Sequence, residues 1–123
     1  SGYYPLSPCR LAYSKTLKNE ADYLKQILGE EHGLSVQDGK RGTIQLVLSD
    51  QIANSEGYRL IVDKDGIRIE GATPQGVFYG IQTFRQLITA CHEGKRVPCI
   101  VINDAPAFKW RSFMLMMAEL LKE

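Results

Sequence analysis

Residues 58–88, which read YRLIVDKDGIRIEGATPQGVFYGIQTFRQLI, contain the change of hydrophobic period that decides the fold. Apolar and polar residues alternate from Tyr58 to Val62 and again from Ile67 to Ile69, as they do in half-buried strands. The intervening segment, Asp63-Lys64-Asp65-Gly66, ends in the Asp-Gly pair that is typical of tight hairpin turns. The first half of this stretch therefore predicts two antiparallel strands joined by a β-turn.

The second half predicts a helix. Four apolar residues repeat at i, i+4, i+7 and i+11 and so share one helical face, namely Val77, Ile81, Phe84 and Ile88. Thr73 is a typical N-cap, and Pro74 suits the first turn because its missing N–H has no helical partner there. Gly76 and Gly80 each cost about 1 kcal/mol relative to alanine unless close packing compensates. We therefore expect this helix to lie unusually close to the strands.

The remaining strands and the other helix are predicted from the same two hydrophobic periods, alternation for strands and a 3.6-residue repeat for helices. A first helix is predicted from Lys15 to Leu28, ending near Gly29 or Gly33. The two prolines of residues 3–8 favour an extended segment that leads into a first strand at a sheet edge. Further strands are predicted at residues 34–37, at residues 43–48, and at residues 97–102, where both alternating sets are apolar and cover on both faces is expected.

This order of elements predicts a single α+β domain in which a mixed, largely antiparallel sheet carries two helices on one face. The chain has 123 residues with 15 Lys and Arg against 14 Asp and Glu, a net charge of +1, and no basic stripe. We therefore expect no nucleic-acid partner. No apolar run approaches the roughly 20 residues of a membrane span, so no span is expected either.

Motifs for an active site are missing from the sequence. It contains no phosphate-binding loop, no G-x-S-x-G nucleophile turn and no H-E-x-x-H zinc motif. His32 and His92 are expected at solvated helix ends or loops, and Glu30 and Glu31 as surface charges. We therefore predict no catalytic, substrate-binding or metal-binding residue and no cofactor.

The three cysteines, Cys9, Cys91 and Cys99, are expected to be free thiols, with a disulfide from Cys91 or Cys9 as the less favoured alternative. Cys99 lies in an apolar run and is expected to be buried.

Two segments together resemble a known family. Residues 71–87, GATPQGVFYGIQTFRQL, are similar to the glycine-spaced helix signature of the β-N-acetylhexosaminidases of glycoside hydrolase family 20, which ends in T-x-x-Q-L. Residues 104–111, DAPAFKWR, resemble the D-x-P-x-F-x-W-R segment with which that family enters its catalytic barrel, and Val97-Pro98 precedes them at a suitable distance. The resemblance covers nearly the whole chain.

The resemblance implies the family's small N-terminal α/β domain, with a zincin-like topology, placed before a (β/α)8 barrel. Residues 1–107 would form this domain, and residues 108–123 would be the start of a truncated barrel segment. Phe108, Trp110 and Arg111 would then be the contacts with the barrel.

The same resemblance implies that this chain is not catalytic by itself. The family's adjacent Asp-Glu pair, in which Glu protonates the leaving oxygen and Asp orients the substrate's acetamido group, belongs to a later barrel strand. Ser112, Met116 and Glu119 stand where the family's first barrel strand has Gly, Asp and an Arg that grips the sugar. The expected function is a non-catalytic domain of an enzyme that removes terminal β-linked N-acetylhexosamine.

Three further expectations remain open at this point. The alternative function is a free-standing binding or assembly module that kept the fold without the barrel. The apolar residues 112–123 are expected either to fold back as a helix or, as the favoured reading, to pack on a second copy in a homodimer. Family resemblance favours a periplasmic or extracellular location if a signal segment has been removed.

Overall fold

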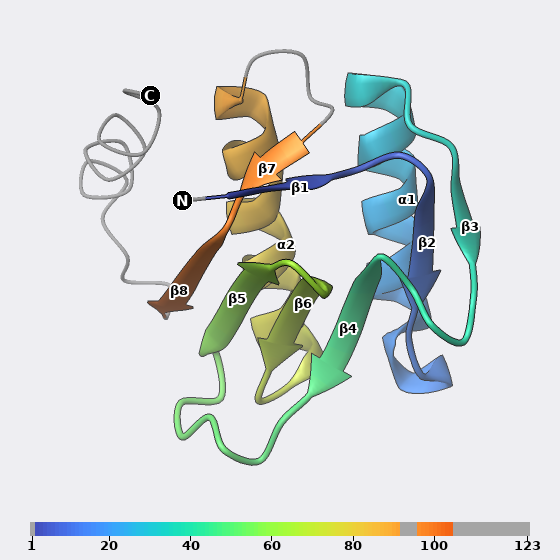
Figure 1. Cartoon of the computed structure of the whole chain (residues 1–123). Coiled ribbons are helices and arrows are strands. Elements are labelled where there is room, and N and C mark those ends of the chain that lie inside the picture. Colours follow the sequence, from blue (N-terminus) through green and yellow to red (C-terminus); the bar gives the residue numbers. More distant parts are fainter. Residues whose placement is uncertain (1, 92–95, 105–123) are drawn as a thin grey trace.

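The computed structural model describes residues 2–91 and 96–104 and consists of one layer of strands and one layer of helices (Figure 1). Six strands form one sheet in the order β3-β2-β4-β6-β5-β8, and β1 and β7 form a separate two-stranded sheet. The elements in chain order are β1 (Tyr3–Pro5), β2 (Cys9–Ala12), a 3-10 turn (Lys15–Leu17), α1 (Lys18–His32), β3 (Val36–Asp38), β4 (Ile44–Leu48), β5 (Tyr58–Asp63), β6 (Gly66–Gly71), α2 (Pro74–Ala90), β7 (Arg96–Pro98) and β8 (Ile100–Asp104).

The predicted hairpin and the helix after it are confirmed. Strands β5 and β6 pair in antiparallel register from Tyr58 opposite Gly71 to Asp63 opposite Gly66. Gly66 has φ 139°, a conformation that residues with a Cβ rarely adopt, so the Asp-Gly turn depends on this glycine. At the start of α2, the Thr73 side chain accepts a hydrogen bond from the Gly76 N–H at 3.2 Å. The expected N-cap is therefore present.

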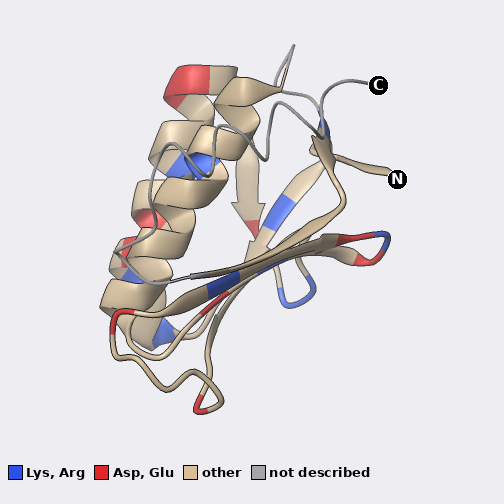
Figure 2. Ribbon diagram, turned by 90° about the vertical axis from the view of Figure 1, so that its left-hand side faces the viewer, with Lys and Arg blue, Asp and Glu red and all other residues tan. Residues whose placement is uncertain are grey.

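The first helix is also confirmed, with its end at the second of the two predicted glycines. Gly33 follows α1 in the left-handed conformation, with φ 65°, and its N–H donates to the Gly29 carbonyl at 3.0 Å. The strand predicted at residues 34–37 is β3, displaced toward the C-terminus by the Gly33 cap. The α+β class and the two helices on one face are thus as expected (Figure 2).

The sheet is mixed as predicted, but it is not largely antiparallel. The pairs β2–β3, β2–β4 and β4–β6 are parallel, and only β5–β6 and β5–β8 are antiparallel. Helix α1 carries the chain back between β2 and β3, so that these strands run in the same direction. The second strand of the hairpin is inserted between β4 and β5, which places β6 parallel to β4.

Two other strand predictions need correction. Residues 3–8 lead into β2, but β2 is an inner strand between β3 and β4 and not an edge. The single covered strand predicted at residues 97–102 is divided into β7 and β8, which belong to different sheets. Pro98 has no N–H for a continuous ladder, and the Cys99 N–H instead donates to the Gly2 carbonyl at 2.8 Å. Val101 in β8 is 52% exposed, so β8 is not covered on both faces.

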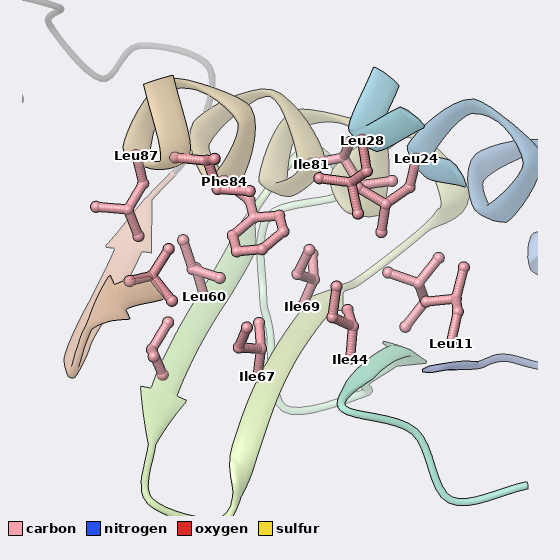
Figure 3. Packing of buried hydrophobic residues seen from close by; sticks show 14 of the residues in the cluster. Leu11, Leu24, Leu28, Ile44, Leu60, Ile67, Ile69, Ile81, Phe84 and Leu87 are labelled. Carbon is pink, nitrogen blue, oxygen red and sulfur yellow. The ribbon is translucent and has the colours of Figure 1, made fainter. Parts of the chain in front are cut away.

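The core lies between the two helices and the sheet (Figure 3). The predicted stripe of α2, Val77, Ile81, Phe84 and Ile88, is fully buried, and the Phe84 ring points toward Leu60 and Ile69 of the sheet. The expected close approach of α2 is confirmed, because a Cβ added at Gly80 would lie 2.6 Å from Cγ2 of Ile69. A Cβ added at Gly76 would lie 2.3 Å from the carbonyl oxygen of Gly57. These two glycines set the distance between α2 and the sheet.

All three cysteines are free thiols, but they differ in access. Cys9 and Cys91 are buried, whereas Cys99 is half-buried and does not have the buried position that was expected for it. Burial raises the pKa of the Cys9 thiol to about 11 and also raises the pKa of Cys91. Both effects reduce the thiolate fraction at neutral pH.

We predict that a chromogenic disulfide reagent such as dithionitrobenzoate modifies Cys99 first in the folded chain. Cys9 and Cys91 should react on the timescale of unfolding, because their sulfurs are covered and protonated. Mass spectrometry of peptides after a short exposure identifies the modified thiol. Early modification of Cys9 would contradict the packing described here.

Candidate functional site

The described part of the chain contains no recognisable reaction centre. Within residues 2–91 and 96–104, no three His, Cys, Asp or Glu residues are grouped so that they could hold a metal ion. Over the same residues, no helix is long and apolar enough to cross a membrane. The predicted barrel contacts Phe108, Trp110 and Arg111, the segment 112–123 and His92 lie outside the described residues. The candidate site is therefore sought among surfaces that could contact another domain.

The outward side of α2 is the first such surface. Among its 17 residues, PQGVFYGIQTFRQLITA, Arg85 is the only charged one. Phe78 faces outward and is 37% exposed. We use the name "α2 face" for this surface, which consists of Gln75, Phe78, Tyr79, Gln82 and Arg85 together with Tyr23 from α1.

Three aromatic rings form the centre of the α2 face. The Phe78 ring centroid lies 5.3 Å from that of Tyr23 and 6.0 Å from that of Tyr79. The Tyr23 hydroxyl accepts hydrogen bonds from Nε2 of Gln82 at 2.6 Å and from Nη1 of Arg85 at 3.3 Å. Nε2 of Gln75 donates to the Tyr79 hydroxyl at 3.1 Å. The aromatic cluster is thus held by polar contacts that join α1 to α2.

An ion pair lies at one end of the α2 face. Nε of Arg85 lies 3.0 Å from both carboxylate oxygens of Glu31, and Nη2 of Arg85 also donates to Glu31. These hydrogen bonds lower the pKa of Glu31 below its usual value of 4.5 and raise that of Arg85. Glu31 is therefore a surface charge, as expected, but one with a partner in the other helix.

The ion pair predicts a pH dependence of stability. Because the folded-state pKa of Glu31 is lowered, its contribution is present above the unfolded-state value near 4.5 and is lost as the pH falls through the folded-state pKa. Both side chains are partly exposed, so the contribution is small. We expect Glu31→Gln to lower the free energy of unfolding at pH 7, by a difference that shrinks below pH 4.5.

Urea unfolding of both proteins at a series of pH values measures this difference. Glu30→Gln is the matched control, since it removes one negative charge from the same helical turn and its carboxylate faces Gln26 instead of an arginine. An equal difference for Glu31→Gln at pH 7 and at pH 3 would exclude the ion pair as its cause.

His32 departs in part from its prediction. It lies in the last turn of α1 and is half-buried, not solvated, and its Nε2 atom is covered without a hydrogen-bond partner among the described residues. The position of His32 in the sequence does not reveal this cover.

The sheet face opposite the helices is the second exposed surface. Glu70 is only 8% exposed there and lies between Nη1 of Arg68 at 3.4 Å and Nη1 of Arg59 at 3.9 Å. Lys and Arg residues are visible on the strands of the sheet in Figure 2. Arg59, Arg68 and Glu70 are therefore paired with one another on this face.

Sequence reasoning did not find the α2 face, because Tyr23 and Phe78 come from different helices. One signal could have indicated it, namely the near absence of charge from residues 74–90, since a helix with a solvated side normally carries several charged residues.

The family profile and the curated relatives agree on one group. Residues 7–105 match the family profile described as glycosyl hydrolase family 20, domain 2. A beta-hexosaminidase from Porphyromonas gingivalis is 36% identical over 119 residues, which are 89% of this chain and 14% of that protein. A beta-hexosaminidase from Vibrio furnissii is 36% identical over 103 residues, 83% of this chain and 16% of that protein.

Solved structures show the same relation. The N-acetyl-beta-hexosaminidase of Streptomyces plicatus, in complex with Thio-NAglucal, superposes with a TM-score of 0.75 at 27% identity. The superposition covers 89% of this chain and 24% of that structure. The chain thus spans less than a quarter of the length of these relatives.

Proposed function

The chain belongs to glycoside hydrolase family 20, and from this we propose that it is a non-catalytic domain that packs against and stabilises a catalytic barrel. The match of residues 7–105 to domain 2 of the family is the observation that carries the proposal. The relatives are beta-hexosaminidases, and we propose accordingly that the whole protein removes terminal β-linked N-acetylhexosamine. Residues 1–107 are the proposed domain, and residues 108–123 begin the barrel segment.

The proposed first contacts with the barrel are Phe108, Trp110 and Arg111. Aromatic residues and arginine are enriched at the centres of protein interfaces, where they provide large contact areas and directed hydrogen bonds. These residues follow β8 after a few positions, so they can reach a neighbouring domain without a long linker.

The test compares the longer polypeptide that includes the barrel with the same polypeptide lacking residues 1–107. If the domain stabilises the barrel, removing it should lower the thermal midpoint of the barrel by several degrees, and hydrolysis of an aryl N-acetyl-β-glucosaminide should be lost at a lower temperature. Equal midpoints and equal heat inactivation would contradict the proposal.

A second proposal concerns the chain as a separate molecule. We propose that residues 112–123 pack on a second copy and form a homodimer when no barrel is present, because the apolar FMLMMA run of this segment favours burial. This would also suit a free-standing binding or assembly module. Light scattering at protein concentrations of tens of micromolar measures the oligomeric state of the full chain and of a version that ends at Lys109. A monomer in both cases would rule out association through this segment.

A further inference from the structure

Unpaired basic side chains gather around one hollow in the surface of the domain. Five lysine and arginine side chains of the described residues have neither an ion pair nor a ring contact, namely Arg10, Lys15, Lys40, Arg41 and Lys64. Lys15 and Lys40 line an open hollow of about 580 Å³, and Arg41 follows Lys40 in the chain. A Cβ added at Gly39, which also lines the hollow, would lie 3.4 Å from Cδ of Arg10. Four of the five unpaired charges are therefore at or beside this hollow.

We propose that this hollow, which we name the "β2–β3 hollow", binds a saccharide that carries a sulfate ester or a carboxylate. The anionic group would lie between Lys15 and Lys40, and the sugar ring would lie against Tyr13, which lines the same hollow. The choice of a saccharide rests on the function proposed above, in which the whole protein acts on a glycoside. The attraction of an anion rests on the described side chains alone.

The β2–β3 hollow lies at a position where α/β sheets commonly bind ligands. Strands β2 and β3 are parallel neighbours, and Leu11 lies opposite Asp38 at their carboxyl ends (Figure 1). After β3 the chain crosses to the other side of β2 and forms β4, so the strand order reverses at β2. The crevice outside the carboxyl ends of strands at such a reversal is the usual ligand site of open α/β sheets. The volume of the hollow also falls within the range of small-molecule sites.

The one carboxylate that lines the β2–β3 hollow does not oppose an anion, because its charge is already compensated. The Asp38 carboxylate accepts hydrogen bonds from Nζ of Lys25 at 2.8 Å and from the Tyr13 hydroxyl at 2.9 Å. These hydrogen bonds lower the pKa of Asp38, so this group is ionised and paired at neutral pH. Lys15 and Lys40 are therefore the uncompensated charges among the residues that line the hollow.

The start of the helical segment adds to the attraction for an anion. Ser14 precedes the 3-10 turn that leads into α1, and its side chain makes no capping hydrogen bond. The first turn also contains no acidic residue, so no side-chain charge compensates the positive end of the helix dipole there. This end lies at Lys15, which lines the hollow.

Tyr13 gives the β2–β3 hollow a surface that suits a sugar ring. The hydrogen bond of its hydroxyl to Asp38 holds the ring, and Nζ of Lys25 lies 5.6 Å from the ring centroid. The faces of a sugar ring present C–H groups, which pack on aromatic and small apolar side chains such as Tyr13 and Ala12. A free inorganic anion would contact the lysines but would gain nothing from this apolar wall. A saccharide with an anionic group should therefore bind more tightly than the anion alone.

An NMR titration of the 123-residue chain with glucose 6-sulfate tests the proposal. Glucose and inorganic sulfate are the matched probes, since each contains only one part of the ligand. At low ionic strength, where exposed charges are little screened, we expect glucose 6-sulfate to shift the amide signals of Lys15, Gly39 and Lys40 until they saturate. It should bind about fivefold or more tightly than either matched probe.

Substitutions locate the two parts of the ligand. Lys15→Gln and Lys40→Gln should each weaken the binding of glucose 6-sulfate by about fivefold or more, because each removes a charged hydrogen-bond donor. Lys64→Gln is the matched control, since Lys64 is an unpaired lysine in the β5–β6 turn, and it should change the affinity by less than about twofold. Tyr13→Leu should reduce the affinity for glucose 6-sulfate to that for inorganic sulfate.

Unchanged amide signals at Lys15, Gly39 and Lys40 would overturn the proposal, and so would an equal affinity for inorganic sulfate or an equal loss in Lys64→Gln. Tighter binding of a thymidine tetranucleotide than of glucose 6-sulfate would assign the hollow to nucleic acid and would also overturn it. Hydrolysis of an aryl N-acetyl-β-glucosaminide by the longer polypeptide tests the proposed enzyme separately. Its absence would refute that enzyme, whereas the titration of the 123-residue chain alone decides the ligand of the hollow.

Discussion

Replacing Phe84 with alanine is expected to lower the free energy of unfolding of this chain by about 3–5 kcal/mol, which is the usual cost of removing a buried phenylalanine. Phe84 is fully buried and is among the largest side chains that are completely covered. Its ring fills the space between α2 and the sheet, toward Leu60 and Ile69 (Figure 3). The glycines of α2 and the pairing of the strands fix the distance between the helix and the sheet. The cavity that Phe84→Ala leaves therefore cannot easily collapse.

Equilibrium unfolding in urea measures the change. Phe78→Ala is the matched control, since it removes the same side chain from the same helix at an exposed position, and should cost about 1 kcal/mol or less. Similar losses for the two variants would show that the described packing of α2 is incorrect.

Gly76→Ala should have the second largest effect, a loss of about 3 kcal/mol. Alanine normally stabilises a helix relative to glycine, but the added Cβ at this position would lie 2.3 Å from the carbonyl oxygen of Gly57. A backbone atom cannot turn aside as a flexible side chain can, so the helix start or the loop before β5 must move. The N-cap at Thr73, whose hydroxyl also donates to the Ser55 carbonyl at 2.6 Å, depends on the same junction.

Gly29→Ala in α1 is the matched control for this substitution. A Cβ there would meet only the Leu34 carbonyl oxygen, at an ordinary 3.7 Å, so this variant should be neutral or more stable by up to about 1 kcal/mol. Thermal unfolding of both variants distinguishes the close approach from a general effect of helix propensity. A stabilising Gly76→Ala substitution would show that α2 lies farther from Gly57.

The local features of this fold could be predicted from sequence because each is determined by residues close together in the chain. The Asp-Gly turn, the Thr73-Pro74 start of α2 and the spacing of its buried stripe are all confirmed. The glycines at 76 and 80 also predicted a non-local property, the close approach of α2, because two glycines in one helix need compensation.

The strand order could not be predicted in the same way. The parallel position of β2 between β3 and β4 depends on how α1 crosses the sheet, and no pattern within Cys9–Ala12 records it. The division of residues 97–102 between two sheets depends on the pairing of β7 with β1, more than 90 residues earlier in the chain. An apolar run fits either one buried strand or two short ones.

The candidate site was even harder to predict from sequence than the strand order. Family resemblance indicated a non-catalytic domain next to a barrel, and the family profile confirms the domain. The resemblance directed attention to Phe108, Trp110 and Arg111, whereas the α2 face appears only when Tyr23 and Phe78 are brought together, 5.3 Å apart between ring centroids. The low charge of residues 74–90 marks α2 as unusual, but it does not indicate that Tyr23 and Phe78 meet.

We propose that this chain contributes packing to a glycosidase and that the reaction takes place in the barrel. The decisive measurement is the release of nitrophenol from an aryl N-acetyl-β-glucosaminide, made in parallel for the pure 123-residue chain and for the longer polypeptide that includes the barrel. General-acid catalysis of this reaction needs a positioned carboxyl group, which the proposed function assigns to the barrel. We expect release by the longer polypeptide and none above background by the chain alone. Release by the pure chain, in proportion to its concentration, would contradict it.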